Sequence, residues 1–287
     1  MSHPTDLPPS HVLTVRAPDQ PGIVARFASA IASCGGNIVE LDQHSDTESQ
    51  DFGCRIEIAH GFDHDRLAAR FDELRDELNA RIEFSVLGTP RERIVVLCSK
   101  TLHCPSDILA RASIGQLDGD VVGVVSDQER GRALAERYEV PFHYLPVGDD
   151  RDAQEQAVAA TLEAIDPTVV VLARYMRVLP GWLVDRYEHR MINIHHSFLP
   201  AFVGANPYAR AHDRGVKLIG ATAHYVTSEL DAGPIITQGV IPVSHRDGVR
   251  DLVHLGADVE RSVLNTALRL HLERRIMVFG ARTCVFD

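Results

Sequence analysis

Three short, continuous apolar runs constrain the fold of this chain most strongly. They cover residues 94–98, 121–125 and 169–172 and are rich in Val, Ile and Leu. Runs of this kind are typical of strands buried on both faces, as in a parallel sheet wrapped by helices. Helical patterns separate the runs, and a long amphipathic pattern over 249–273 follows near the end. The alternation predicts an α/β domain with an open, mostly parallel, Rossmann-like sheet.

A different pattern precedes these runs. Residues 11–87 are predicted to form strand, helix, strand, strand, helix and strand, in that order. The two helices are indicated by apolar residues recurring at helical spacing, and the strands by short extended apolar or alternating patterns. This βαββαβ order is that of a ferredoxin-like domain. The polar segment 88–93 contains Gly and Pro and predicts a linker. We therefore expect two domains, over 1–88 and 89–287.

Composition excludes several classes of protein. A net charge of −11 disfavours a nucleic-acid partner, because phosphate binding needs a basic surface. No apolar run is long enough to span a bilayer, and the first residues lack the pattern of a secretory signal, so we expect a cytoplasmic protein without a membrane partner. The five cysteines are scattered without a C-x-x-C pair, and the histidines show no recognisable ligand spacing, so we expect no metal.

Polar residues gather at one predicted strand end. Asn193 and His195 lie at the end of a short apolar run, and Asp231 lies in a turn just before Gly-Pro. Alternation along a strand projects Asn193 and His195 to the same side and His196 to the other. Ligands of open α/β sheets bind beyond the carboxyl ends of the strands. An amide, an imidazole and a carboxylate without a further nucleophile suit chemistry at an acyl carbonyl.

The segment NIHHSFLP, which begins at Asn193, resembles the N-x-H-x-S-x-L-P signature of the formyltransferases that use 10-formyltetrahydrofolate. Residues 220–235 resemble the second motif of that family, and the likeness covers about residues 92–287. The resemblance implies that Asn193 and His195 polarise the formyl oxygen. It also implies that Asp231 governs proton transfer and positions the imidazole.

The sequence of the loop after the first strand of this domain distinguishes two branches of the family. Glycinamide ribonucleotide transformylases hold a substrate phosphate there in a glycine-rich loop, whereas residues 98–107 contain no glycine. They resemble instead the S-K-x-x-H-C-x-x-D run of formyltetrahydrofolate deformylases. Those enzymes also carry an N-terminal ACT domain, which the first module resembles in its D-x-P-G-I-V start at Asp19. The chain departs from the family pattern at 126–128 and at Gly53.

The resemblance implies hydrolysis of 10-formyltetrahydrofolate to tetrahydrofolate and formate, with formate feeding purine synthesis and the one-carbon pool kept in balance. The folate is the substrate, and no cofactor is implied. Asp231 is the expected general base, acting on water directly or through a relay. The implied substrate-binding residues are Arg174, Met176, Arg177, Val178, Leu179, Gly204 and Asn206. For Arg174 the alternative is a structural role, paired with a buried acid.

The first domain is expected to regulate rather than catalyse. ACT domains bind small amino acids where a glycine-containing turn meets a helix N-terminus. Here that indicates Asp19, Gly22 and Asn37, with glycine or methionine as the effector. Such domains commonly pair through their sheets, so a homo-oligomer is expected.

Two other functions stay open at this point. One is a formyltransferase that uses 10-formyltetrahydrofolate and an amine acceptor, which the glycine-free loop at 98–107 opposes. The other is a folate- or amino-acid-binding sensor without catalysis, which the intact set of Asn193, His195 and Asp231 opposes.

Overall fold

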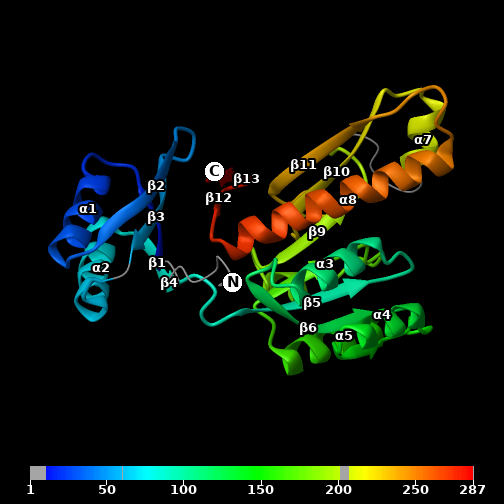
Figure 1. Cartoon of the computed structure of the whole chain (residues 1–287), viewed down its shortest axis with the longest axis horizontal. Helices are drawn as coiled ribbons and strands as arrows, with labels where there is room; N and C mark the ends of the chain where they lie inside the picture. The colour runs from blue at the N-terminus through cyan, green and yellow to red at the C-terminus, as the bar shows by residue number, and fades with distance from the viewer. Residues whose placement is uncertain (1–10, 60, 201–206, 287) are drawn as a thin grey trace, which may run out of the picture. The chain divides into compact units, whose positions relative to one another are not determined.

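The computed structural model describes residues 11–59, 61–200 and 207–286. The chain divides into two compact units (Figure 1). The first comprises the residues up to Pro90 together with the segment from Leu270, and the second comprises Arg91–Arg269.

The first unit has the predicted βαββαβ order. Its elements are β1 (His11–Pro18), α1 (Ile23–Ser33), β2 (Asn37–Asp46), β3 (Asp51–Ala59), α2 (His64–Leu78) and β4 (Arg81–Val86). The four strands form an antiparallel sheet in the order β2-β3-β1-β4. Apolar side chains of both helices, among them Phe27 and Phe71, are buried in one cluster with the inward side chains of the strands. The predicted ACT-type fold is confirmed.

A C-terminal hairpin also belongs to the first unit. It consists of β12 (Ile276–Phe279) and β13 (Arg282–Val285). Arg282 binds the buried carboxylate of Asp46 at 2.9 Å, and the Arg16 guanidinium donates to the carbonyl oxygen of Val278. The sequence pattern assigned residues 270–287 to the second domain. The structure differs because these long-range polar contacts, which no local pattern reveals, hold the hairpin against the first sheet.

Seven strands form the sheet of the second unit, in the order β11-β10-β9-β8-β5-β6-β7. Strands β5 to β9 pair in parallel, while β10 pairs antiparallel with both of its neighbours, β9 and β11. The strands are β5 (Glu92–Cys98), β6 (Gly119–Ser126), β7 (Phe142–Tyr144), β8 (Val169–Leu172), β9 (Met191–His195), β10 (Leu218–Tyr225) and β11 (Ile235–Pro242). The predicted mostly parallel sheet is confirmed.

Helices cover this sheet (Figure 1). The helices described after β5 are α3 (His103–Ser113), α4 (Arg132–Arg137), α5 (Arg151–Ile165), α6 (Gly181–Asp185), α7 (Pro207–Asp213) and α8 (Val249–Leu272), with a 3-10 turn at Glu129–Gly131. The chain passes from β5 to β6 on one side, whereas β8 lies on the other side of β5. Strand order thus reverses at β5, and α/β proteins bind ligands beyond the carboxyl ends of the strands near such a reversal.

Gly53 on β3 allows the hairpin to approach the first sheet. A Cβ atom there would lie 2.6 Å from the Phe279 ring and would also overlap the Met277 sulfur. We expect Gly53→Ala to lower the free energy of unfolding by about 1–3 kcal/mol, because the hairpin must shift to make room. Urea unfolding measures the effect. Gly148→Ala adds a Cβ to open space and serves as the matched control, expected to change stability by less than about 0.5 kcal/mol; equal midpoints for the two variants would contradict the role of Gly53.

Candidate active site

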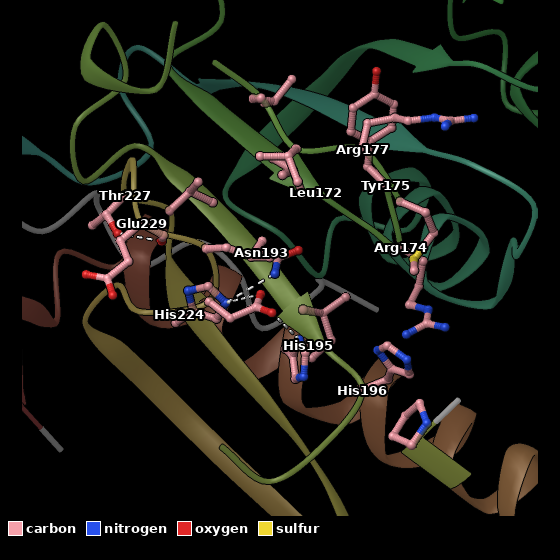
Figure 2. Close-up of a pocket in the computed structure, with 18 of the residues that line it drawn as sticks. Leu172, Arg174, Tyr175, Arg177, Asn193, His195, His196, His224, Thr227 and Glu229 are labelled. Carbon is pink, nitrogen blue, oxygen red and sulfur yellow. Dashed lines mark hydrogen bonds and ion pairs between the residues drawn. The ribbon is translucent and has the colours of Figure 1, made fainter. Parts of the chain in front are cut away.

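The predicted catalytic residues line a cavity of about 590 Å³ at the carboxyl ends of β8 and β9. Asn193 and His195 both face it, as strand alternation predicts (Figure 2). The parallel pairing of β8 with β9 places Leu172 opposite Asn193, so the loop that follows β8 forms an adjoining wall.

Asp231 reaches this cavity from the turn between β10 and β11. Its backbone is left-handed, with φ of 55°. The turn closes so tightly that a Cβ on Gly233 would overlap the Tyr225 carbonyl, while Tyr225 N–H donates to the carbonyl of Pro234 at 2.9 Å. The Asp-Ala-Gly-Pro motif therefore folds the carboxylate back toward β9. Asp231 Oδ2 lies 3.1 Å from His195 Nδ1.

His224 completes the cluster, and the sequence analysis did not select it. The antiparallel register of β9 and β10 places it opposite Asn193. Its Nδ1–H donates to the Tyr225 carbonyl at 2.8 Å, and in that tautomer Nε2 accepts from the Asn193 amide at 3.1 Å. Asp231 Oδ1 lies 3.7 Å from the same Nε2 (Figure 2). His224 thus fixes the side-chain orientation of Asn193.

Charge in the cluster is concentrated on Asp231. The hydrogen bond from His195, together with the His224 ring, holds the pKa of this carboxyl well below its usual range despite partial burial. Asp231 therefore stays ionised at neutral pH. With Nδ1 of His195 facing the carboxylate, Nε2 is buried and has no hydrogen-bond partner among the described residues. That nitrogen keeps an unused hydrogen-bonding position at the wall of the cavity.

His196 was expected to point away from this site, and this expectation is wrong. Its ring lines the same cavity, 5.2 Å from the His195 ring between centroids. Strand β9 ends at His195, so alternation no longer governs the next residue. Burial, and then the charge of Arg174, lower the pKa of His196 to about 4, so this imidazole is neutral.

The loop after β8 supplies the predicted wall of the cavity. Arg174, Met176, Arg177, Val178 and Leu179 all line it, together with Tyr175. Met176 and Val178 are more than half exposed and so present apolar surface to the cavity. The predicted residues Gly204 and Asn206 lie outside the described part of the chain.

Two polar contacts hold this loop in place. The backbone N–H of Met176 donates to Ser99 Oγ at 3.2 Å, which ties the loop to the end of β5. Arg177 binds the buried carboxylate of Asp127 at 2.7 Å. Asp127 belongs to the segment 126–128 that departs from the family pattern. In the structure its side chain pairs with Arg177.

Arg174 also has a buried acidic partner, as its alternative interpretation requires. Its Nε lies 3.4 Å from Glu260 on α8. The same carboxylate contacts His103 at 2.8 Å and accepts from the Tyr208 hydroxyl at 2.6 Å. Burial alone would raise the pKa of Glu260, but His103, Arg174 and Tyr208 together lower it, so the group is ionised.

The expected effector residues lie at two places in the first unit. Asp19 and Gly22 are in the turn between β1 and α1, where Gly22 precedes the helix with φ of 90°. Asn37 is the first residue of β2.

No helix in the described part of the chain is both long and apolar enough to cross a membrane.

Similar proteins agree with this architecture. Residues 92–268 match the family model described as formyl transferase, and residues 11–79 match that of the ACT domain. A formyltetrahydrofolate deformylase from Synechocystis is 45% identical and one from Bacillus subtilis 42% identical, each over 96% of this chain and over 97% and 93% of the relative. The crystal structure of a formyltetrahydrofolate deformylase from Pseudomonas syringae superposes with a TM-score of 0.93 at 42% identity, covering 99% of this chain and 96% of that one.

A glycinamide ribonucleotide transformylase from Symbiobacterium toebii matches less of the chain. Its TM-score is 0.65 at 35% identity, over 68% of this chain and 94% of its own length. The fold and site thus define a formyl transferase-type catalytic domain joined to an ACT domain. Within that class, the chain belongs to the formyltetrahydrofolate deformylase family.

The low pKa of Asp231 should depend on His195. In His195→Ala we expect the Asp231 pKa to rise toward its ordinary value of 3.8, because the main hydrogen-bond donor is gone. Carboxyl ¹³C NMR of aspartate-labelled protein measures it, with the Asp231 signal assigned by its loss in Asp231→Asn. Since the folded-state pKa is lowered, the stability from this pairing is present above the ordinary Asp pKa and lost as pH falls through the folded value. The control His212→Ala, at an exposed pair with Asp213, should leave Asp231 unchanged; an unaltered Asp231 titration in His195→Ala would refute the assignment.

Proposed function

We propose that this chain hydrolyses 10-formyltetrahydrofolate to tetrahydrofolate and formate. The observation that carries the proposal is the cluster of Asn193, His195 and Asp231, joined by hydrogen bonds and ion pairing at the wall of one cavity. Family membership supports the choice of reaction, because the full-length relatives are named for it. Water attacks the formyl carbon, the bond from carbon to N10 breaks, N10 gains a proton, and formic acid leaves as formate with loss of a proton.

His195 and Asp231 move the proton in this proposal. A carboxylate whose pKa is held so low is a weak acceptor, which favours a relay over direct action of Asp231 on water. Nε2 of His195 takes the proton of the attacking water, and Asp231 stabilises the imidazolium through Nδ1–H. The new Nε2–H then donates to the tetrahedral intermediate and passes to the leaving N10. Asp231 therefore acts through His195.

Asn193 stabilises the oxyanion. One amide hydrogen is directed to His224, which leaves the other for the formyl oxygen. Donors fixed before the reaction begins need no reorganisation as negative charge develops. His224 acts as a positioning residue, since it holds the amide in the orientation that presents this donor.

The folate is proposed to place its pterin against the loop after β8. The exposed apolar side chains of Met176 and Val178 support a planar ring there, and the backbone of the loop can read its polar edge. Gly204 and Asn206 stay as predicted contacts. We infer that the reaction needs no cofactor beyond the substrate, because the cluster supplies a proton carrier and an oxyanion donor. We place the enzyme in the cytoplasm, where formate feeds purine synthesis.

Transfer to an amine is the less favoured function. The loop after β5 lacks the glycines of a phosphate cradle, and Ser99 in that loop is buried and bonded to Met176. The transformylase structure also matches a smaller part of the chain than the deformylase structure does.

Hydrolysis predicts formate release from 10-formyltetrahydrofolate with no amine added. Asn193→Ala should reduce kcat about 10²- to 10³-fold, because one oxyanion donor is lost. Asp231→Asn should lose at least as much, because the imidazolium is no longer balanced by a charge. A coupled formate assay measures both, and circular dichroism checks that each variant folds. Release that requires an added amine would indicate transfer, and near-normal turnover of Asp231→Asn would remove the relay.

We propose further that the ACT domain binds an amino-acid effector, glycine or methionine, and that the chain is a homo-oligomer. The left-handed Gly22 exposes the N-terminus of α1, whose partial positive charge suits a carboxylate. Activity and oligomeric mass should therefore be measured over a panel of amino acids. We expect glycine or methionine to change the rate of formate release, and Gly22→Val to abolish that response, because a β-branched residue is strained at φ of 90° and distorts the turn. A rate indifferent to the panel would remove the effector.

A further inference from the structure

One side of the catalytic cavity is not used by the mechanism above. Arg174, His196 and Tyr208 line it, and we call it the arginine side. Figure 2 shows Arg174 and His196 on the opposite side of His195 from His224. The arginine side therefore adjoins the imidazole at which the formyl group is cleaved, and Arg174 stands at the start of the loop after β8.

Arg174 brings an incompletely satisfied positive charge to this place. Its side chain is only 13% exposed, and its Nε and Nη1 are buried without a hydrogen-bond partner among the described residues. Buried donors are nearly always hydrogen-bonded, and a buried cation needs an anion close by. The backbone of Arg174 is left-handed, with φ of 64°, a conformation that a non-glycine residue keeps only where its surroundings hold it.

Glu260 does not complete the requirements of Arg174. One of its oxygens accepts from Tyr208, and the other lies 2.8 Å from His103 and 3.4 Å from Arg174 Nε. The Glu260 carboxylate thus contacts Tyr208, His103 and Arg174, and it contacts the Arg174 guanidinium only at Nε. This leaves Nη1 without an acceptor, and it fixes the guanidinium in position beside His196.

We propose that the arginine side holds the formate product, with Arg174 as the residue that binds it. A guanidinium and a carboxylate pair through two parallel hydrogen bonds, the strongest geometry available to either group. Formate is the smallest carboxylate and forms at His195, next to this side of the cavity. Neutral His196 adds no competing charge. The inference rests on the proposed function, because hydrolysis is what generates formate here.

A metal site at the same cluster is the competing interpretation. His103, Cys104 and Glu260 offer three ligand atoms within 4.8 Å of one another. However, Arg174 and Tyr208 already contact the carboxylate, and a guanidinium at 3.4 Å repels a cation. Burial raises the pKa of the Cys104 thiol, so the thiolate that a metal requires is disfavoured. The cluster is thus better suited to orient Arg174 toward an anion.

The test is the binding of [¹³C]formate to the folate-free enzyme, followed by its NMR line width at constant ionic strength. Wild type should broaden the signal, and Arg174→Gln should weaken formate binding at least about tenfold, because the fork and the charge are both lost. Arg174→Lys keeps a positive charge beside Glu260 and serves as a second variant in case Arg174→Gln does not fold. We expect it to bind formate about threefold more weakly than wild type, because an ammonium point charge replaces the two parallel donors of the guanidinium. Arg177→Gln is the matched control, since Arg177 lines the same cavity but is already paired with Asp127, and it should bind formate as wild type does.

Three outcomes would overturn the proposal. They are unchanged formate binding in both Arg174 variants, loss of binding in Arg177→Gln instead, and displacement of formate by equal concentrations of chloride or inorganic phosphate. Binding of added formate does not depend on turnover. If the wild-type enzyme hydrolyses the folate but does not bind formate, only this inference is contradicted. If it binds formate but does not hydrolyse the folate, only the proposed function is contradicted.

Discussion

The contact between Asp231 and His195 is the interaction on which the rest of the site depends. It requires the turn after β10 to fold back over the edge of β9, which Gly233 permits by letting the backbone meet the Tyr225 carbonyl. It also requires β10 to run antiparallel to β9, since that register brings His224 opposite Asn193. One carboxylate thereby organises two imidazoles and, through His224, the amide. The antiparallel strand beside an otherwise parallel sheet is what makes this cluster possible.

Long-range polar contacts hold the wall around this cluster in place. Ser99, directly after β5, uses its hydroxyl to hold the backbone of Met176, so the loop that would otherwise cradle a phosphate is tied to the wall of the folate cavity. On the other side of His195, the buried group of Glu260, Tyr208 and Arg174 is held by its own internal contacts. Both features come from residues that contact one another across long sequence separations.

The sequence predicted what depends on local patterns. Continuous apolar runs located β5, β6 and β8, and strand alternation correctly placed Asn193 and His195 on one face. The same rule misplaced His196, because it holds only as far as the strand extends. His224 was missed for a different reason: its importance follows from the register between β9 and β10, and register is a property of two strands. A polar residue within an otherwise apolar strand was the signal available for it.

The C-terminal segment shows the same limit at a larger scale and links the two units by the chain itself. Helix α8 contributes Glu260 to the buried group and Val249 and Val253 to the cavity wall. It ends at Leu272, and the chain then forms the hairpin that packs on the first sheet through Met277, Phe279 and Arg282. The segment from α8 to the hairpin therefore belongs to the second unit up to Arg269 and to the first unit from Leu270. Glu260 and Arg282 lie in this one segment, and each pairs with a residue far away in the sequence, so no local pattern could have revealed either contact.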